Sequence, residues 1–336
     1  MKLKLSLLLF LPILFLSCKN TNVEQVREEW AIVLHGGAGG GWQFFENGQK
    51  APREMSQERQ QEYIVELNNA LKVGADYLSK GGSALDAVEK VVIYLENCPL
   101  FNAGKGAVMT ADGIHELDAA IMDGSNLEAG AIAGVRDVRN PILAARAVME
   151  HSPHVLLIGE GASYFAKEQG LEIVENSYFT TDPRARQLRE EKKESRQGEP
   201  MGTVGCVALD KNGNLAAATS TGGMSGKKWG RVGDVPIIGA GTYANNEEVA
   251  ISGTGHGELW IRRVVAYDIY SLMHYGGMNL ESAAKDVIWN KIDKMEGSGG
   301  GVICVDKSGN IAMEFDTALM YRAWAKSSGD TGAAIY

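Results

Sequence analysis

The sequence contains few cysteines, and none of them is spaced as a zinc site requires. Only 4 of its 336 residues are cysteine. Cys98, Cys206 and Cys304 follow a fourth near the N-terminus, and no CxxC or zinc-knuckle spacing occurs among them. Cys206 and Cys304 lie in the apolar runs TVGCVALD and GGVICVD, where a free cysteine packs as a small hydrophobic residue. We therefore expect no zinc site.

An excess of basic residues is also missing. The chain has 33 Lys and Arg against 42 Asp and Glu, which gives a formal net charge of -9 and a pI of about 5.3. A nucleic-acid-binding surface needs a basic face that displaces counterions from phosphates. The composition therefore argues against a nucleic-acid partner and is compatible with a small polar substrate.

The N-terminal apolar run is too short to cross a membrane. It extends over residues 5–16, whereas a membrane-spanning helix needs ~20 apolar residues. Two lysines precede this run and a serine and a cysteine follow it, which is the pattern of an export signal over residues 1–17.

The end of this signal resembles the lipobox of bacterial lipoproteins, because a small residue stands directly before Cys18. On that resemblance Cys18 is the lipid-modified first residue of the mature chain and residues 18–29 form a tether. The protein would then lie in the bacterial cell envelope, on the periplasmic side, and contact the membrane by its lipid anchor only. In the alternative interpretation the signal is an ordinary cleaved one and Cys18 is incidental.

The rest of the chain has the composition of a globular protein, with 45% hydrophobic and 22% charged residues. Its 41 glycines gather in clusters, for example at 36–41, 222–223 and 297–301. Such clusters indicate tight turns and close approach of backbone segments.

Apolar periodicity and capping residues predict the elements up to residue 180. WAIVLHGG reads as a buried strand that ends in a glycine turn. A helix is expected from Ser56 to about Lys80, with glycines as its stop, and a second from Ser83 to the loop at Asn97. The other elements expected here are strands at 114–122 and 129–135, a helix at 141–150, a strand at HVLLIG and a short helix at GASYFAKEQG.

The second half of the sequence predicts β-hairpins rather than strand–helix–strand units. TVGCVALD and GNLAAATST flank an Asn-Gly turn, and GGVICVD and IAMEFD flank a turn over residues 307–310. Between them we expect a strand region at 235–243, a strand at VAISGTG and helices at about 257–274 and 279–294. Strands and helices in blocks indicate an α+β protein with stacked, antiparallel-rich sheets flanked by helices.

A charged segment at residues 181–202 interrupts this pattern. TDPRARQLREEKKESRQGE lacks a consistent apolar stripe, so we interpret it as a linker. It ends at Gly202, directly before a buried strand that begins with Thr203. A cut between these two residues would expose a hydroxyl nucleophile whose own α-amino group, with a pKa of roughly 7.7–8.0 in model compounds, can act as its base. Taken alone, a threonine in this position more often only opens a strand.

Residues 202–246, GTVGCVALDKNGNLAAATSTGGMSGKKWGRVGDVPIIGAGTYANN, strongly resemble the plant-type asparaginase/isoaspartyl peptidase family. The resemblance extends to LHGGAGG, CPLFNAGKGAV, HELDAAIMDG, RNPILAARAVME, SGTGHGE and MYRAW. It implies an αββα sandwich of the N-terminal-nucleophile hydrolase type. Self-cleavage would give two chains, an α chain whose folded part is 30–202 and a β chain of 203–336, in an (αβ)2 assembly.

The same resemblance implies the activity and the catalytic residues. The enzyme would hydrolyse β-aspartyl dipeptides and L-asparagine and release L-aspartate, without a catalytic cofactor. Thr203 would be the nucleophile, Thr221 would hydrogen-bond it, and Thr254 and Gly255 would stabilise the oxyanion. Asn102 would bond to the nucleophile region. Without the family context, Thr221 is a strand-end residue and GTGHG only a glycine-rich turn.

Substrate binding would depend on the segment GRVGD. In the family, Arg231 holds the substrate's α-carboxylate and Asp234 its α-amino group, with Gly257 nearby. The alternative is a solvated pair of opposite charges in a loop. His35 and His256 stand near glycine turns, and we interpret both as structural.

The segment LENCPLFNAGK resembles a loop that binds sodium through main-chain carbonyls in related enzymes. The corresponding carbonyls here are those of Leu95, Glu96, Cys98, Phe101, Ala103 and Lys105. Lys105 departs from the aliphatic residue expected at its position. The insertion GGWQFFENGQKAPRE and the export signal are further departures from the cytoplasmic relatives.

Three other functions stay open at this point. A glycosylasparaginase of the same fold usually has Asp-Thr-Ile-Gly at the junction, where this chain has Gly-Thr-Val-Gly. A threonine aspartase is disfavoured by the intact GRVGD. A catalytically silent envelope lipoprotein is disfavoured by the complete set of the five residues Thr203, Thr221, Arg231, Asp234 and Thr254.

Overall fold

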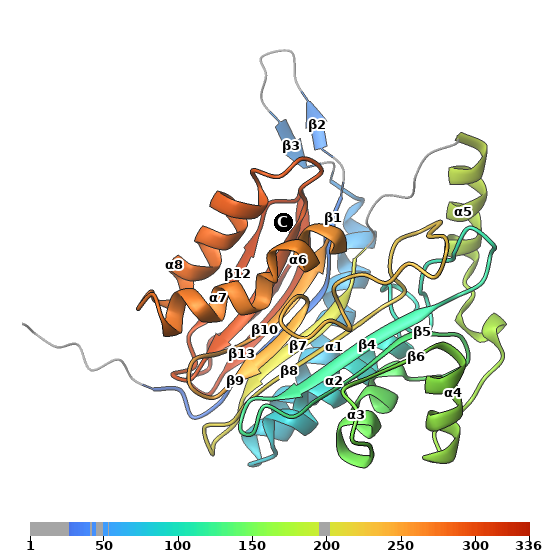
Figure 1. Ribbon diagram of the computed structural model, residues 1–336. Helices are drawn as coiled ribbons and strands as arrows, with labels where there is room; N and C mark the ends of the chain where they lie inside the picture. Colours follow the sequence, from blue (N-terminus) through green and yellow to red (C-terminus); the bar gives the residue numbers. More distant parts are fainter. Residues whose placement is uncertain (1–26, 41, 45–49, 53, 195–201) are drawn as a thin grey trace, which may run out of the picture.

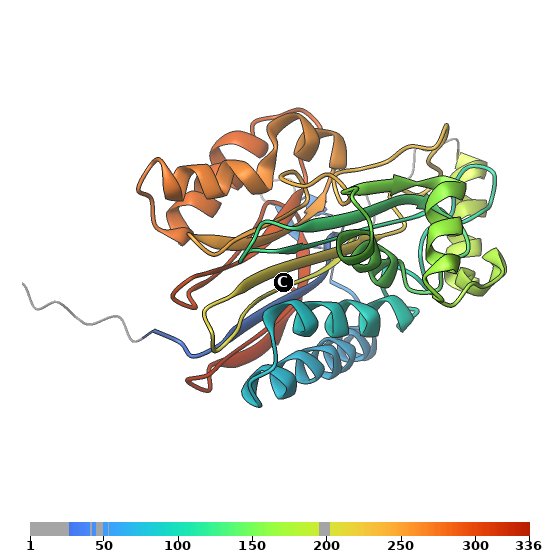
Figure 2. The same cartoon turned by 60° about the horizontal axis from the view of Figure 1, so that its bottom comes forward.

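Two β-sheets stacked face to face form the centre of the computed structural model, and helices cover the outer face of each sheet (Figures 1 and 2). The structure describes residues 27–40, 42–44, 50–52, 54–194 and 202–336. The predicted export signal and Cys18 therefore lie outside the described residues. The four layers are those of the αββα arrangement that the sequence led us to expect.

The larger sheet is antiparallel except at one edge, where β5 and β6 run parallel. Its order is β14 (Thr331–Ala334), β13 (Leu319–Lys326), β1 (Ala31–Gly39), β7 (Val204–Leu209), β8 (Leu215–Thr221), β4 (Leu117–Asp123), β5 (Ala129–Val135) and β6 (Leu156–Ile158). The smaller sheet has the order β12 (Ile311–Phe315), β11 (Gly300–Asp306), β10 (Val249–Gly255) and β9 (Thr242–Asn245). A separate hairpin pairs β2 (Trp42–Phe44) with β3 (Lys50–Pro52).

The helices divide between the two outer faces. The larger sheet is covered by α1 (Gln57–Ser79), α2 (Ala84–Asn97), α3 (Pro141–His151) and α4 (Gly159–Glu168). The smaller sheet is covered by α6 (Gly257–Arg263), α7 (Val265–His274), α8 (Leu280–Lys285) and the π-helical turn η2 (Asp286–Ile292). A 3-10 turn, η1 (Asn176–Phe179), leads to α5 (Asp182–Glu194), the last helix before the predicted junction. Among the described residues, none of the helices has the length and apolarity that crossing a bilayer requires.

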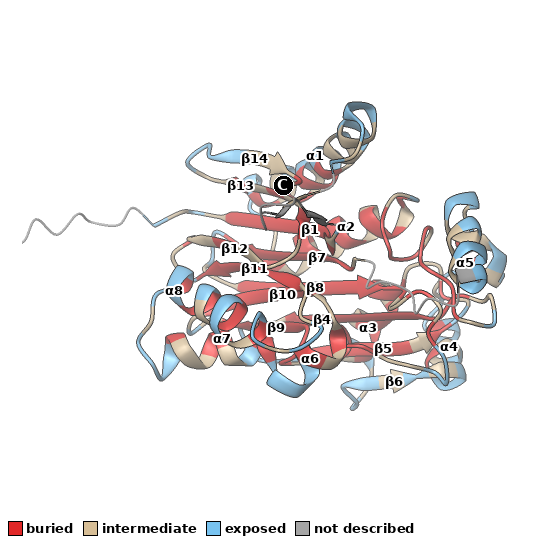
Figure 3. Ribbon diagram, turned by 90° about the horizontal axis from the view of Figure 1, so that it is seen from above, coloured by how far each residue is buried: buried red, intermediate tan, exposed pale blue. Residues whose placement is uncertain are grey.

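Both faces of the larger sheet are buried, as the alternation of its side chains shows. On β1, Ile32 and Leu34 pack against the helices, whereas Ala31 and Val33 pack against the smaller sheet. Successive side chains of a strand point to opposite faces, so one strand serves two cores. Figure 3 shows these central strands as buried along most of their length. This double burial explains why WAIVL and TVGCVALD read as continuous apolar runs.

The two hairpins predicted from the sequence are present and have the same turn chemistry. In the turn between β7 and β8, Asp210 accepts hydrogen bonds from the main-chain N–H groups of Asn212 and Asn214. Asp306 accepts in the same way from Ser308 and Asn310 between β11 and β12. Asp210 also accepts the N–H of Ala84 at the start of α2, which ties this turn to the helix layer.

Helix starts were predicted well, and three other predictions hold only in part. Ser56 and Ser83 cap α1 and α2 through the N–H groups three residues on. The helix predicted at 257–274 is instead divided at Val264, whose φ of 51° is left-handed. The one predicted at 279–294 continues from α8 as a π-helix, and residues 235–241 form turns before β9.

The charged segment after residue 181 also differs from what its sequence suggested, because 13 of its residues form α5. It is rich in Arg, Glu and Lys, which favour helices, and Leu188 is its buried apolar contact. Arg184 donates to the carbonyl of Gly106, and Glu191 accepts from the hydroxyl of Ser225. A few specific contacts therefore hold a helix that lacks an apolar stripe.

Candidate active site

Thr203 lies directly before β7, buried between the two sheets. Its hydroxyl donates to the hydroxyl of Thr221 over 3.2 Å. The pairing of β7 with β8 produces this contact, because Val204 is opposite Ser220. Thr221 is fixed in turn, since its Oγ1 accepts the N–H of Gly223 at 3.0 Å.

The peptide bond before Thr203 is closely surrounded by backbone. Gly202 has a φ of +21°. A Cβ atom on Gly37 would collide with the Cα atom of Gly202. The amide of Asn102 donates to the carbonyl of Gly202 at 2.7 Å and to that of Gly223 at 2.8 Å. A donor is thus already placed on the carbonyl that would develop negative charge if Thr203 attacked it.

His35 lies on the other side of Thr203, which the sequence did not indicate. Its Nδ1 is 2.8 Å from the carbonyl oxygen of Thr203, and its Nε2 is 3.0 Å from Oγ of Ser252. Burial lowers the pKa of His35 to about 3, so the ring is neutral. A carbonyl can only accept, so Nδ1 carries the proton and Nε2 accepts from Ser252.

This assignment orients a chain of buried hydroxyls. Ser252 uses its proton on His35, so Thr219, at 2.8 Å, donates to Ser252. Thr242 lies 2.7 Å behind Thr219 and donates to it. Gly205 makes room for the chain, because a Cβ there would collide with Ser252 and His35. The carbonyl of the proposed nucleophile is therefore held by a network that crosses both sheets.

Thr254 and Gly255 end β10, in the smaller sheet. Thr254 is fully buried and its Oγ1 accepts the N–H of Ala38, near the end of β1, at 3.2 Å. Gly255 has a φ of +148° and packs on the backbone of Gly299, so no side chain fits there. The structure places Gly255 in the same small pocket as the two threonines. That pocket is lined by Thr203, Thr221, Gly223, Met224, Arg231, Gly233, Asp234 and Gly255.

Arg231 and Asp234 both reach this pocket, but they are not a solvated pair. Arg231 donates two hydrogen bonds to Glu258, Nε to Oε1 at 2.9 Å and Nη2 to Oε2 at 2.8 Å. Burial raises the pKa of Asp234 to about 7, and its Oδ2 has no partner among the described residues. A Cβ on Gly257 would lie 2.8 Å from Arg231 Nη2 and 2.9 Å from Asp234 Oδ1. We expected the guanidinium of Arg231 to be open to substrate. It is instead bonded to Glu258, a residue that the sequence analysis did not indicate.

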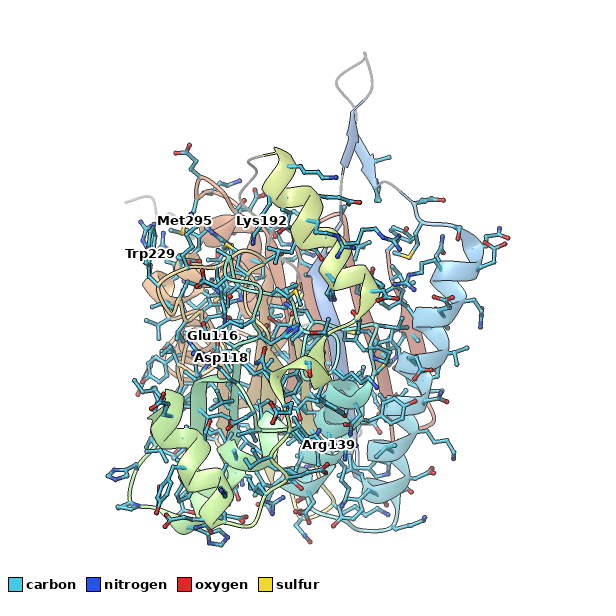
Figure 4. All side chains as sticks on the ribbon, turned by 90° about the vertical axis from the view of Figure 1, so that its right-hand side faces the viewer. Glu116, Asp118, Arg139, Lys192, Trp229 and Met295 are labelled. Atoms are coloured by element: carbon cyan, nitrogen blue, oxygen red, sulfur yellow. The ribbon has the colours of Figure 1, made fainter. Side chains whose placement is uncertain are left out.

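A second group of buried charges lies beside the site and was also missed. Lys227 is buried and its Nζ donates to the carbonyl of Glu116 at 2.9 Å. Burial raises the pKa of Asp118, whose Oδ1 accepts the N–H of Gly134. Figure 4 labels Glu116 and Asp118, which stand two residues apart at the start of β4. In the sequence, Lys227 stands in the polar run GKKWG, where nothing distinguishes it from a surface lysine.

Glu96 supports the site from the helix layer. One of its carboxylate oxygens accepts from the hydroxyl of Ser220 at 2.7 Å and from the N–H of Ile142 at 3.0 Å, and the other from the amide of Asn140. Burial raises its pKa to about 7. Glu96 thus caps α3 and anchors the residue next to Thr221. The sequence had indicated only its main-chain carbonyl, as a cation ligand.

The predicted cation loop joins α2 to the site through Asn102. The carbonyl of Glu96 accepts the N–H of Lys105 at 2.7 Å, and the Lys105 ammonium lies over the ring of Tyr178. Of the predicted set, Leu95, Cys98, Phe101 and Ala103 are buried, so their carbonyls are shielded from solvent. In the described ranges, no three His, Cys, Asp or Glu side chains gather as a metal site. His256 stands at the start of α6, and its Nε2 lies 3.5 Å from Oε2 of Glu258.

Comparison with known proteins gives one consistent result. The sequence model of the family described as asparaginase matches residues 28–335. The chain is similar to the isoaspartyl peptidase of Escherichia coli K12, with 50% identity over 316 residues, which cover 91% of this chain and 95% of that protein. It is 46% identical to a putative isoaspartyl peptidase/L-asparaginase of Dictyostelium discoideum, over 87% of this chain and 92% of that protein. It is also 42% identical to the isoaspartyl peptidase/L-asparaginase of Xenopus laevis, over 89% and 92%.

The low pKa of His35 predicts a specific loss of stability in acid. The native ring stays neutral down to about pH 3, whereas an unfolded histidine binds a proton below about 6.5. Its contribution to stability is therefore present above pH 6.5 and is lost as the pH falls from 6.5 toward 3, by about 1.4 kcal/mol per pH unit. Urea unfolding at pH 7.5, 6.5, 5.5 and 4.5 measures this for the wild-type residue and for His35→Gln, both in a Thr203→Ala background that keeps the chain uncut and its unfolding reversible.

We expect the wild-type free energy of unfolding to fall more steeply with acid than that of the variant. His154→Gln, at an exposed histidine, is the matched control and should keep the wild-type slope. Equal slopes for wild type and His35→Gln would show that the ring is not held neutral.

Proposed function

Because this chain belongs to the asparaginase family, we propose that it is a self-activating amidohydrolase. It hydrolyses β-aspartyl (isoaspartyl) dipeptides and L-asparagine and releases L-aspartate. The observation that carries the proposal is the buried contact of Thr203 with Thr221, in a pocket that also holds Arg231 and Asp234. The names of the relatives support the substrate class.

Self-cleavage is the first proposed reaction. The Thr203 hydroxyl adds to the carbonyl carbon of Gly202, the C–N bond breaks, and the proton passes to the nitrogen. The resulting ester is then hydrolysed by water, which leaves a carboxylate on Gly202 and a free α-amine on Thr203. The hydrogen bond from Asn102 to the Gly202 carbonyl supports this step, because it strengthens as charge develops on the oxygen.

Amide hydrolysis follows with the same residue. The new α-amine takes the proton of the Thr203 hydroxyl, which attacks the side-chain carbonyl of the bound aspartyl group. Thr254 and Gly255 would stabilise the oxyanion from the opposite sheet. The leaving amine takes a proton and departs, and water hydrolyses the aspartyl ester to free L-aspartate.

Substrate binding requires Arg231 to exchange partners. The two hydrogen bonds that it now gives to Glu258 have the geometry that a substrate α-carboxylate would take over. Oδ2 of Asp234 has no hydrogen-bond partner among the residues that the structure describes, and a substrate ammonium would supply one and favour the ionised carboxylate. A substrate that carries both groups therefore matches both residues.

The product of self-cleavage is proposed to be an α chain from Cys18 to Gly202 and a β chain from Thr203 to Tyr336, assembled as (αβ)2. The charged end of the α chain would include α5. Of the other functions weighed, a threonine aspartase lacks support because Arg231 and Asp234 both line the pocket.

We also propose that the loop of residues 95–105 holds a sodium ion in a structural role. The ligands would be the main-chain carbonyls predicted from the sequence, and carbonyl oxygens bind hard cations. Gly106, with a φ of +115°, lets the loop fold so closely that a Cβ there would lie 2.8 Å from the carbonyl of Phe101. A melting temperature higher in NaCl than in choline chloride of equal ionic strength supports the ion. Equal melting temperatures contradict it.

Export and a lipid on Cys18, with a place on the periplasmic side of the envelope, remain proposals from the sequence pattern alone. The mass of the N-terminal fragment tests them, because lipid adds hydrocarbon chains to Cys18. A free thiol on Cys18, or a fragment that begins elsewhere, removes the anchor and leaves the enzymatic proposal unchanged.

The purified wild-type protein should separate into two fragments on a denaturing gel, the smaller beginning at Thr203. Thr203→Ala should stay in one piece, because it has no hydroxyl to add to the Gly202 carbonyl. Thr203→Ser is the matched control and should still cleave. If Thr203→Ala is cut as completely as wild type, Thr203 is not the attacking residue.

Removal of either charged residue should impair hydrolysis and spare self-cleavage. Truncating one partner of a buried charge pair costs roughly 2 to 5 kcal/mol, so Arg231→Ala and Asp234→Ala should lose about 30-fold to several-thousand-fold in kcat/KM. The assays use β-Asp-Leu and L-asparagine, with α-Asp-Leu as a control substrate. Asp76→Ala, at an exposed ion pair on α1, should be unchanged. Equal hydrolysis of α-Asp-Leu, or normal efficiency of both variants, would contradict the proposal and favour a protein-cutting enzyme.

A further inference from the structure

A second, larger hollow opens next to the pocket of Thr203. Met224 and Arg231 line both, so the two are adjacent. One wall of the outer hollow is α5 with Leu188 and Lys192, the next is the loop of residues 224–231, and the third is the start of α6. We call it the outer chamber. Its residues therefore lie next to the pocket that Thr203 lines.

Trp229 lies in the loop wall of this chamber, with an exposed side chain and an unfavourable backbone conformation. Its side chain is 98% exposed, and its φ of 57° is left-handed, which is rare for a bulky residue. Such a backbone costs on the order of 1–2 kcal/mol. The contact found for its ring within the described residues is the ammonium of Lys228, 5.8 Å from the centroid. No other contact among the described residues offsets this exposure or strain, and strained residues of this kind gather at ligand-binding and active sites.

The chamber also contains positively charged side chains that are available to a ligand. Of its two carboxylates, Glu191 accepts from the Ser225 hydroxyl, and Glu258 accepts from Arg231 until the substrate α-carboxylate takes over that guanidinium. Lys192 and Lys228 form no ion pair within the part of the chain that the structure describes. Figure 4 shows Lys192 on α5 and Trp229 on the loop, toward the same end of the molecule. An incoming group that is apolar in its body and anionic at its end would match this surface.

We propose that the outer chamber binds the leaving residue of a β-aspartyl dipeptide and selects for a large apolar side chain with a free α-carboxylate. This rests on the proposed function, which places the aspartyl half in the inner pocket. The inner pocket is the smaller of the two and is already lined by the groups that would hold that half. The leaving residue would pack its side chain on Trp229 and Leu188, and Lys228 would attract its carboxylate.

The first test compares kcat/KM for β-Asp-Phe with that for L-asparagine, which has no leaving side chain. In Trp229→Ala the ratio of the two values should fall about 5- to 20-fold, as expected for the loss of one aromatic contact. Tyr275→Ala, at another exposed aromatic residue, is the matched control and should keep the wild-type ratio. An unchanged ratio in Trp229→Ala overturns the proposal. So does a change in oligomeric mass by light scattering with an unchanged ratio, which would make Trp229 a contact between protein copies.

The second test removes the carboxylate from the substrate. Wild type should prefer β-Asp-Phe over its C-terminal amide at low salt, and Lys228→Gln should reduce that preference about 2- to 5-fold. The same preference in wild type and variant overturns the part assigned to Lys228. If wild type hydrolyses neither L-asparagine nor any dipeptide, the proposed function fails and this inference fails with it. If wild type hydrolyses L-asparagine and the dipeptides but the expected ratios are not found, only the proposal for the outer chamber fails.

Discussion

The register between β7 and β8 is the constraint on which the candidate site depends. It sets Val204 opposite Ser220 and thereby brings the hydroxyls of Thr203 and Thr221 within 3.2 Å. Because side chains alternate along a strand, a slip by one residue would turn these hydroxyls to the wrong face of the sheet. The turn at Asp210 and the carboxylate of Glu96 hold this register from the two ends of β8.

The candidate site contains several buried ionisable groups, and removing a charged group from water is unfavourable. Burial raises the pKa values of Glu96 and Asp234 to about 7, and Asp118 and Lys227 are both buried, close enough for their opposite charges to interact. A charged group removed from water is tolerated when hydrogen bonds or an opposite charge replace the solvent. Glu96 has three such bonds and acts as structure, whereas Asp234 has an oxygen left without a partner among the described residues. That difference separates a supporting carboxylate from one that can receive a ligand.

Sequence reasoning predicted the layers and the hairpins because local signals specify them: serine caps, Asn-Gly turns and runs of apolar residues. It failed where tertiary contacts decide the outcome. No residue near Val264 in the sequence predicts the left-handed conformation that divides this helix. The sequence of α5 has no apolar stripe, so it does not predict that Leu188 is buried. In the site, Thr203, Thr221 and Asn102 were anticipated through the family resemblance. That resemblance did not indicate the partner of Arg231 or the contact of His35, and no local signal links pairs that are 27 and 168 positions apart.

The order of the larger sheet has a consequence for assembly. Strands from before and after the junction alternate in it: β13 and β14 are followed by β1, then β7 and β8, then β4 to β6. A cut before Thr203 would leave two polypeptides joined along three strand pairings, β1 with β13, β1 with β7, and β4 with β8. While the chain is intact, the linker keeps both halves at a high effective concentration, so folding is unimolecular. After the cut, recovery from the unfolded state would be a second-order encounter between two incomplete sheets. Unfolding and refolding of the mature enzyme would therefore show hysteresis, and the precursor alone would carry the information to fold efficiently at low concentration.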